Sequence, residues 1–268
     1  MSKLFSVAFL AVVAAFLTAC AVPMRHYRPN PFNPVYTVAV LPLYNATNDV
    51  GGAQKVREEF DKRIRNRQYS VMPLKDVDRM LLDGMGVTLG DQLEMSSPQQ
   101  LGELLAVDGV VYGYLLDFDD ITTGLYNVKK VRAAFKLVET RTGAVIWSRG
   151  LGVKSVLAGS NAGAGVTLLK ELIGSNDANE PFGVIPGLIG IPGLKEWRVI
   201  RLGSTHKAGD AAVISLGEKI ITKALGVHLM LEASDMLNII TSDFPVGPGS
   251  ARTGGATGQP DLTAPGAR

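Results

Sequence analysis

The sequence contains a single cysteine, Cys20, among its 268 residues. An intramolecular disulfide, or a zinc or iron–sulfur site built from several cysteines, is therefore excluded. The chain also has little net charge, because 27 basic and 25 acidic residues leave a formal charge of +2. It lacks the overall positive charge with which proteins attract nucleic acid, so no nucleic-acid partner is expected.

A hydrophobic run long enough to cross a membrane is missing at the N-terminus. The apolar stretch Leu4–Leu17, interrupted only by Ser6, is too short for an ordinary transmembrane helix. It follows Lys3 and ends in the small residues Thr18 and Ala19. A positive start, a short apolar stretch and small residues before the cleavage point are typical of a signal peptide, which is expected to cover residues 1–19.

The tetrapeptide Leu17–Cys20 resembles the lipobox of bacterial lipoproteins. This resemblance implies that the Cys20 thiol carries a diacylglyceryl group and that the new N-terminus is acylated. Two such lipid attachments are enough for stable membrane anchoring. Because Ala21 rather than aspartate follows the cysteine, we expect the outer membrane, with the domain on the periplasmic face; surface exposure stays open.

The rest of the chain divides by composition into three parts. Residues 20–34 hold the lipidated cysteine and four prolines, and are expected to form an extended tether. Residues 245–268 are rich in glycine and proline, with few apolar side chains, and are expected to be a disordered tail. One folded domain is expected over residues 35–244, with an insertion at about 155–195.

Hydrophobic periodicity predicts the elements of this domain. Strands are expected at 36–43, 69–73, 108–118, 130–137 and 144–149, and helices at 51–67, 75–82, 98–106, 209–225 and 228–240. Their order predicts an α/β (α+β) fold: a single domain with a mixed β-sheet of about five strands and helices packed on one side.

The strand at 130–137 alternates cleanly between apolar and mostly polar residues. One face is expected to be covered by helices and the other to be wet, as is common for antiparallel sheets. The residues of the expected wet face are Lys130, Arg132, Ala134 and Lys136.

Three stretches of the domain resemble a known family. They are Val38–Pro42 followed by Asn45, the approach Leu104–Val111, and Leu137–Glu139 with Thr142-Gly143 and Trp147-Ser148. Together they resemble the periplasmic α/β module of CsgG-like secretion lipoproteins, of the amino-terminal domain of TolB and of similar surface lipoproteins of unknown function. The resemblance covers about residues 36–150 and implies a non-catalytic interaction module.

No motif of the chain predicts catalysis or a bound cofactor. The glycine-rich stretch 159–165 lacks the Lys-Ser/Thr of a phosphate loop, and His26, His206 and His228 have no metal-ligand spacing. Asp117, Asp119 and Asp120 lack the loop of a calcium site and are interpreted as a polar strand exit. We therefore expect no enzyme activity, no cofactor, no metal and no small-molecule substrate.

The apolar stretch at 182–194 is the one candidate for a partner contact. Glycines and prolines interrupt it, which prevents a regular buried element but keeps apolar area available. We expect it to be an association surface rather than core. The candidate contact residues are Val184, Ile185, Leu188, Ile189, Ile191 and Leu194.

Two functions fit these observations. The first is a lipid-anchored, non-catalytic protein-interaction or assembly module of the cell envelope, with envelope proteins or a second copy of the chain as partner. The second is a subunit or accessory of a CsgG-like secretion complex. The second needs two alternating segments that leave the domain for the bilayer, and residues 155–194 do not alternate in that way.

Overall fold

The computed structural model describes residues 27–122, 126–158, 185, 187–201 and 229–249. Cys20, Val184, the expected helix at 209–225 and the chain after Gly249 lie outside these residues. The elements, in chain order, are β1 (Thr37–Val40), β2 (Tyr44–Asn45), α2 (Gly52–Ile64), β3 (Ser70–Val71), α3 (Leu74–Met85), the 3-10 helix η1 (Gly90–Met95), α4 (Pro98–Leu105), β4 (Gly109–Thr122), β5 (Tyr126–Glu139), β6 (Val145–Ala158), β7 (Trp197–Arg201), α7 (Met230–Ile240) and the 3-10 helix η2 (Thr241–Asp243).

The strands form one mixed sheet, as the sequence predicts, but with seven strands rather than about five. Its order is β3-β1-β4-β5-β6-β7, and the short β2 also pairs with β4. The central strands β4, β5 and β6 are antiparallel and have 14 residues each, while β1, β2, β3 and β7 join in parallel. The two additional strands are β2, which has two residues, and β7, which directly follows the expected insertion.

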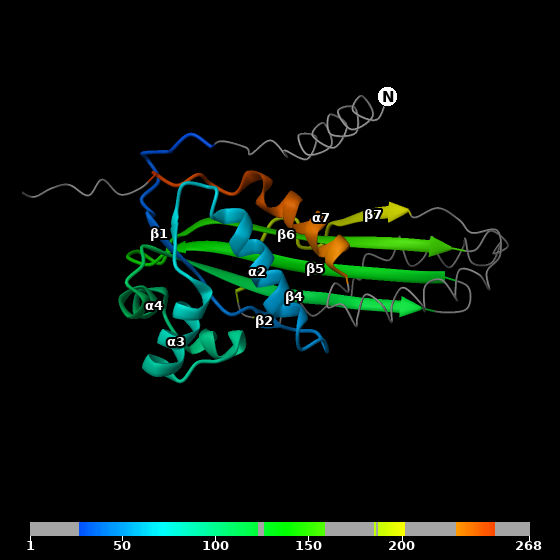
Figure 1. Cartoon of the computed structure of the whole chain (residues 1–268), viewed down its shortest axis with the longest axis horizontal. Helices are drawn as coiled ribbons and strands as arrows, with labels where there is room; N and C mark the ends of the chain where they lie inside the picture. The colour runs from blue at the N-terminus through cyan, green and yellow to red at the C-terminus, as the bar shows by residue number, and fades with distance from the viewer. Residues whose placement is uncertain (1–26, 123–125, 159–184, 186, 202–228, 250–268) are drawn as a thin grey trace, which may run out of the picture.

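The main core lies between the long strands and the helices α2 and α7 (Figure 1). Val56, Phe60 and Ile64 recur along α2 at helical spacing and are fully buried. The ring of Phe60 stacks on that of Phe135 from β5, with centroids 4.1 Å apart. It also meets the edge of the Phe244 ring at 5.7 Å, so one side chain joins helix, sheet and C-terminal segment.

The opposite face of the sheet is also covered, which corrects the expectation of helices on one side. Ala39 and Leu41 alternate with Val38 and Val40 along the chain, and they pack against α3 and α4 instead of α2. Helix α4 begins where the sequence predicts, because the Ser97 hydroxyl accepts a hydrogen bond from the Gln100 amide.

The expected tether and tail contribute to the described domain. The Asn30 amide donates a hydrogen bond to the Gly247 carbonyl at 2.9 Å, and the Asn33 side-chain amide donates to Val246 at 3.0 Å. The Gly247 amide in turn donates to the Arg67 carbonyl at 2.8 Å. Residues 27–34 and 245–249 therefore belong to the fold, since they satisfy backbone groups that composition alone assigned to extended or disordered chain.

Within the described part of the chain, no helix combines the length and the apolar character needed to cross a membrane.

Candidate functional site

The strand face that was expected to be wet is largely covered. Arg132 is 1% exposed, and the Trp197 ring lies over its guanidinium at 3.9 Å. Asp117 accepts a hydrogen bond from Lys130 at 2.7 Å and pairs with Arg132 at 3.1 Å. The acidic residue at this point of β4 therefore neutralises cations of β5 rather than ending the strand in solvent.

The apolar stretch after residue 184 covers the neighbouring part of the same face. Leu188, Ile191 and Leu194 are at most 8% exposed and pack with Tyr114 and Ala134 of the sheet. The expectation that the whole stretch is surface is therefore wrong for these three residues in this structure. They are buried because the sheet face beneath them is itself apolar.

Two other residues of the stretch differ from these three. Ile185 is half-buried against the same cluster, whereas Ile189 is 82% exposed. Of the described candidate contact residues, Ile189 is the one that projects from the domain.

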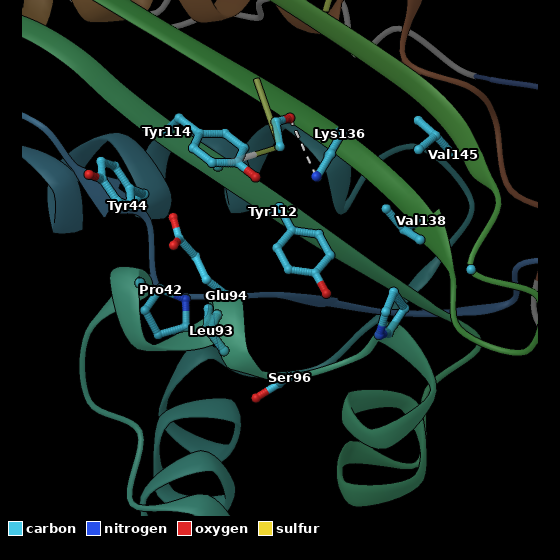
Figure 2. A pocket seen from close by; sticks show the side chains of 15 residues that line it. Pro42, Tyr44, Leu93, Glu94, Ser96, Tyr112, Tyr114, Lys136, Val138 and Val145 are labelled. Atoms are coloured by element: carbon cyan, nitrogen blue, oxygen red, sulfur yellow. Dashed lines mark hydrogen bonds between the residues drawn. The ribbon is translucent and has the colours of Figure 1, made fainter. Parts of the chain in front are cut away.

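A pocket of about 280 Å³ opens beside this segment (Figure 2). Its walls come from β2, η1, the beginning of α4, the strands β4 and β5, the first residue of β6, and Gly187 of the apolar stretch. Tyr112 of β4 lies directly opposite Lys136 of β5 in the antiparallel register. Because paired residues of adjacent strands project to the same side of a sheet, both side chains face this pocket.

Aromatic rings surround the Lys136 ammonium group. Its nitrogen lies 4.9 Å from the centre of the Tyr112 ring and 5.6 Å from that of Tyr114. Tyr44 adds a third ring, tilted by 39° at 6.1 Å from Tyr114. The two distances from the Lys136 nitrogen, to the Tyr112 and Tyr114 rings, fall within the range of cation–π attraction.

The groups of the pocket are partly removed from water. Burial lowers the pKa of Lys136, because the charged ammonium form loses hydration. Burial also raises the pKa of Tyr112 to about 12. The pKa of Tyr114 is raised first by burial and then by the nearby Tyr112 and Glu94. Both phenols therefore stay protonated at neutral pH and can donate hydrogen bonds.

Gly187 permits the apolar stretch to approach this cluster closely. Its backbone has a φ of +83°, and a Cβ atom there would lie 2.4 Å from the Tyr114 hydroxyl and 2.7 Å from the Lys136 ammonium. A glycine is needed because an L side chain would both strain the backbone and fill the pocket.

Sequence reasoning did not identify this pocket. It placed Tyr112 and Tyr114 in a buried strand and Lys136 on a wet face, without pairing the two strands. The missing step was the pairing of β4 with β5, whose antiparallel register sets Tyr112 opposite Lys136.

In the described residues, no group of three or more histidine, cysteine, aspartate or glutamate side chains is arranged to hold a metal ion. Cys20, the candidate lipidation residue, lies outside them.

Comparison with known proteins gives one family match and several relatives. The family model described as "Putative lipoprotein GNA1162-like" matches residues 33–175. The curated protein "Putative lipoprotein NMB1124/NMB1162" of Neisseria meningitidis serogroup B is 26% identical over 157 residues, which are 58% of this chain and 72% of that protein.

Two solved structures are similar to part of this chain. The lipoprotein GNA1162 from Neisseria meningitidis is 23% identical with a TM-score of 0.42, over 54% of this chain and 99% of that one. The LpoB C-terminal domain from Salmonella enterica is 15% identical with a TM-score of 0.33, over 52% of this chain and 90% of that one.

Proposed function

Since the chain belongs to the GNA1162-like lipoprotein family, we propose that lipid on Cys20 anchors it to the outer membrane and that its domain binds another envelope protein there. Membership in this family confirms the lipoprotein family expected from the sequence motifs. The anchor residue, the membrane, the periplasmic orientation and the non-catalytic binding role are the parts we propose.

The lipid anchor is supported by the position of the sole cysteine. Cys20 ends the Leu-Thr-Ala-Cys motif directly after a short apolar stretch, and the family match begins at residue 33. Residues 21–26 separate Cys20 from the described domain, which begins at Tyr27.

The binding role is supported by exposed apolar side chains that line the pocket or neighbour its lining residues in the sequence. Val145 lines the pocket and is 57% exposed; Met95, between the lining residues Glu94 and Ser96, is 93% exposed. Ile189 follows two residues after the lining residue Gly187. Apolar side chains grouped around a concave site are typical of a surface that a protein partner covers. This grouping is the observation that carries the proposed binding function.

Cys20→Ser is expected to abolish lipid attachment. Cells expressing the wild-type chain and grown with an alkyne fatty acid should yield a labelled protein in the membrane fraction. The label should survive neutral hydroxylamine, which cleaves thioesters but not thioethers or amides. The variant should carry no label and should accumulate as precursor or soluble protein. An unlabelled wild-type chain, or equal labelling of the variant, would contradict the anchor.

Ile189 is expected to lie at the contact with the partner. A photo-crosslinking amino acid at position 189 should give a discrete crosslinked species in intact envelopes. The same group at Leu231 serves as the control, because Leu231 is 64% exposed but belongs to α7 on the opposite face of the sheet. Identical crosslinks from both positions, or none from position 189, would argue against binding at this surface.

A further inference from the structure

The pocket contains a half-buried cation, Lys136, that no carboxylate of the described residues contacts. Among the residues that the structure describes, no carboxylate lies within 4.0 Å of the Lys136 ammonium, and its one hydrogen bond is a long one of 3.4 Å to the Gly187 carbonyl. A cation that has lost part of its hydration is stabilised by an anion close to it. A negatively charged group from outside the described residues would therefore stabilise the Lys136 ammonium.

Two phenol hydroxyls accompany this cation. Neither Tyr112 nor Tyr114 makes a side-chain hydrogen bond to another described residue, although Tyr114 is only 6% exposed. Figure 2 shows both rings and the Lys136 nitrogen at the same opening. An ammonium group and two phenols supply several hydrogen-bond donors, which suit the two oxygens of a carboxylate.

Glu94, in the wall opposite Lys136, limits the number of negative charges that a ligand of this pocket can carry. Glu94 lies across the pocket in Figure 2 and is exposed to solvent. Its negative charge repels a second acidic group, so a ligand with one carboxylate is favoured over an acidic run. The rings of Tyr44 and Tyr114 and the side chain of Val145 provide apolar area for a neighbouring group.

The pocket is large enough for part of a peptide. Its volume of about 280 Å³ is close to the lower end of the range of about 300–1,000 Å³ that is usual for ligand pockets. One acidic residue with a neighbouring apolar side chain matches this space. The exposed Val145 lies at the rim of the pocket, and the exposed Ile189 belongs to the apolar stretch that contributes Gly187.

We propose that this pocket binds a single carboxylate of an exposed segment of the partner protein, held by Lys136, Tyr112 and Tyr114, with an adjacent apolar residue against the rim. The inference rests on the proposed function and specifies the chemistry of its partner. The carboxylate comes either from an aspartate or glutamate side chain or from the C-terminus of the partner, and the experiment separates these sources.

The test uses the lipidated mature chain in detergent, with its lysines converted to ¹³C-dimethyl-lysine, which keeps the positive charge. The resonance of Lys136 is identified by its loss in Lys136→Met. Two peptide pairs serve as probes: acetyl-Ala-Ala-Asp-Leu-Ala-amide against its asparagine analogue, and acetyl-Ala-Ala-Leu with a free carboxylate against its amide. Sodium acetate tests the response to a carboxylate without a peptide.

At least one carboxylate peptide is expected to shift the Lys136 resonance and raise its pKa, while its neutral analogue binds at least tenfold more weakly. Lys136→Met should weaken binding at least tenfold, and Tyr112→Phe several-fold. Lys75→Met, at an exposed lysine of α3, should have no effect. Binding of the aspartate peptide alone identifies a side-chain carboxylate, and binding of the free-carboxylate peptide alone identifies a C-terminus.

The proposal is overturned if neither carboxylate peptide shifts the resonance, if Lys136→Met binds as well as the wild type, or if acetate binds as tightly as the peptides. These outcomes leave the lipid label on Cys20 and the crosslink from position 189 unaffected. Failure of the carboxylate site is thus distinguishable from failure of the proposed function.

Discussion

Phe60→Ala is expected to lower the free energy of unfolding by about 3–5 kcal/mol, as is usual when a large aromatic side chain is removed from a core. Phe60 is fully buried and contacts both Phe135 and Phe244 through ring packing. The substitution leaves a cavity where α2, β5 and the C-terminal segment meet. Urea denaturation of the full chain, followed by circular dichroism, measures the loss.

Phe32→Ala is the matched control, because Phe32 is 91% exposed. The same atoms are removed there without opening a cavity, so the free energy of unfolding should change by no more than about 0.5 kcal/mol. Equal effects of the two substitutions would mean that Phe60 is not the side chain that joins helix, sheet and C-terminal segment.

The neighbouring substitutions Leu188→Ser and Ile189→Ser are expected to differ sharply. Leu188 is 1% exposed and packs on Tyr114, so its loss should lower the free energy of unfolding by about 2–5 kcal/mol. Ile189→Ser should change it by no more than about 0.5 kcal/mol, because this side chain is 82% exposed. Paired thermal and urea unfolding of the two variants measures the difference.

This pair also separates packing from binding. Ile189→Ser should reduce crosslinking to the partner while the domain unfolds at the wild-type temperature. If Leu188→Ser unfolds like the wild type, the apolar stretch does not pack on the sheet as described. If Ile189→Ser is the destabilised variant, Ile189 rather than Leu188 is the side chain buried against the sheet.

Much of the fold could be predicted because local signals agree with it. A helix starts at Pro98 in both the sequence pattern and the structure, and the strands expected at 130–137 and 144–149 are the neighbours β5 and β6. Gly143 has a φ of +73°, which a glycine adopts without strain. The ends of elements were less predictable. The strand expected at 144–149 corresponds to β6, which continues to Ala158.

The residues at β1 indicate that both faces of the sheet are covered, although the expected fold placed helices on one side. Val38 and Val40 face one way, and Ala39 and Leu41 face the other; all four are apolar. A strand that is apolar on both sides requires two covering layers, so the expectation of helices on one side conflicted with this strand.

The candidate site was harder to predict because it depends on contacts between distant segments. The sheet register sets Tyr112 beside Lys136, but the third wall comes from Gly187, about fifty residues further along the chain. Its segment has no helical or strand periodicity, so no pattern indicates where it packs. The exposed Ile189 and the buried Leu188 are equally apolar, and only the packed structure distinguishes them.

The pairing of residues 27–34 with residues 245–249 has a mechanical consequence. Tension between a lipid on Cys20 and a partner held by the domain would enter the fold at residues 27–33. It would first load the bonds from Asn30 to Gly247 and from Asn33 to Val246, which lie outside the sheet. If these contacts open before the sheet does, the tether would lengthen by several residues while the strands β4, β5 and β6 stay paired. The contacts between residues 27–34 and 245–249 would then open under tension and leave the binding surface of the domain folded.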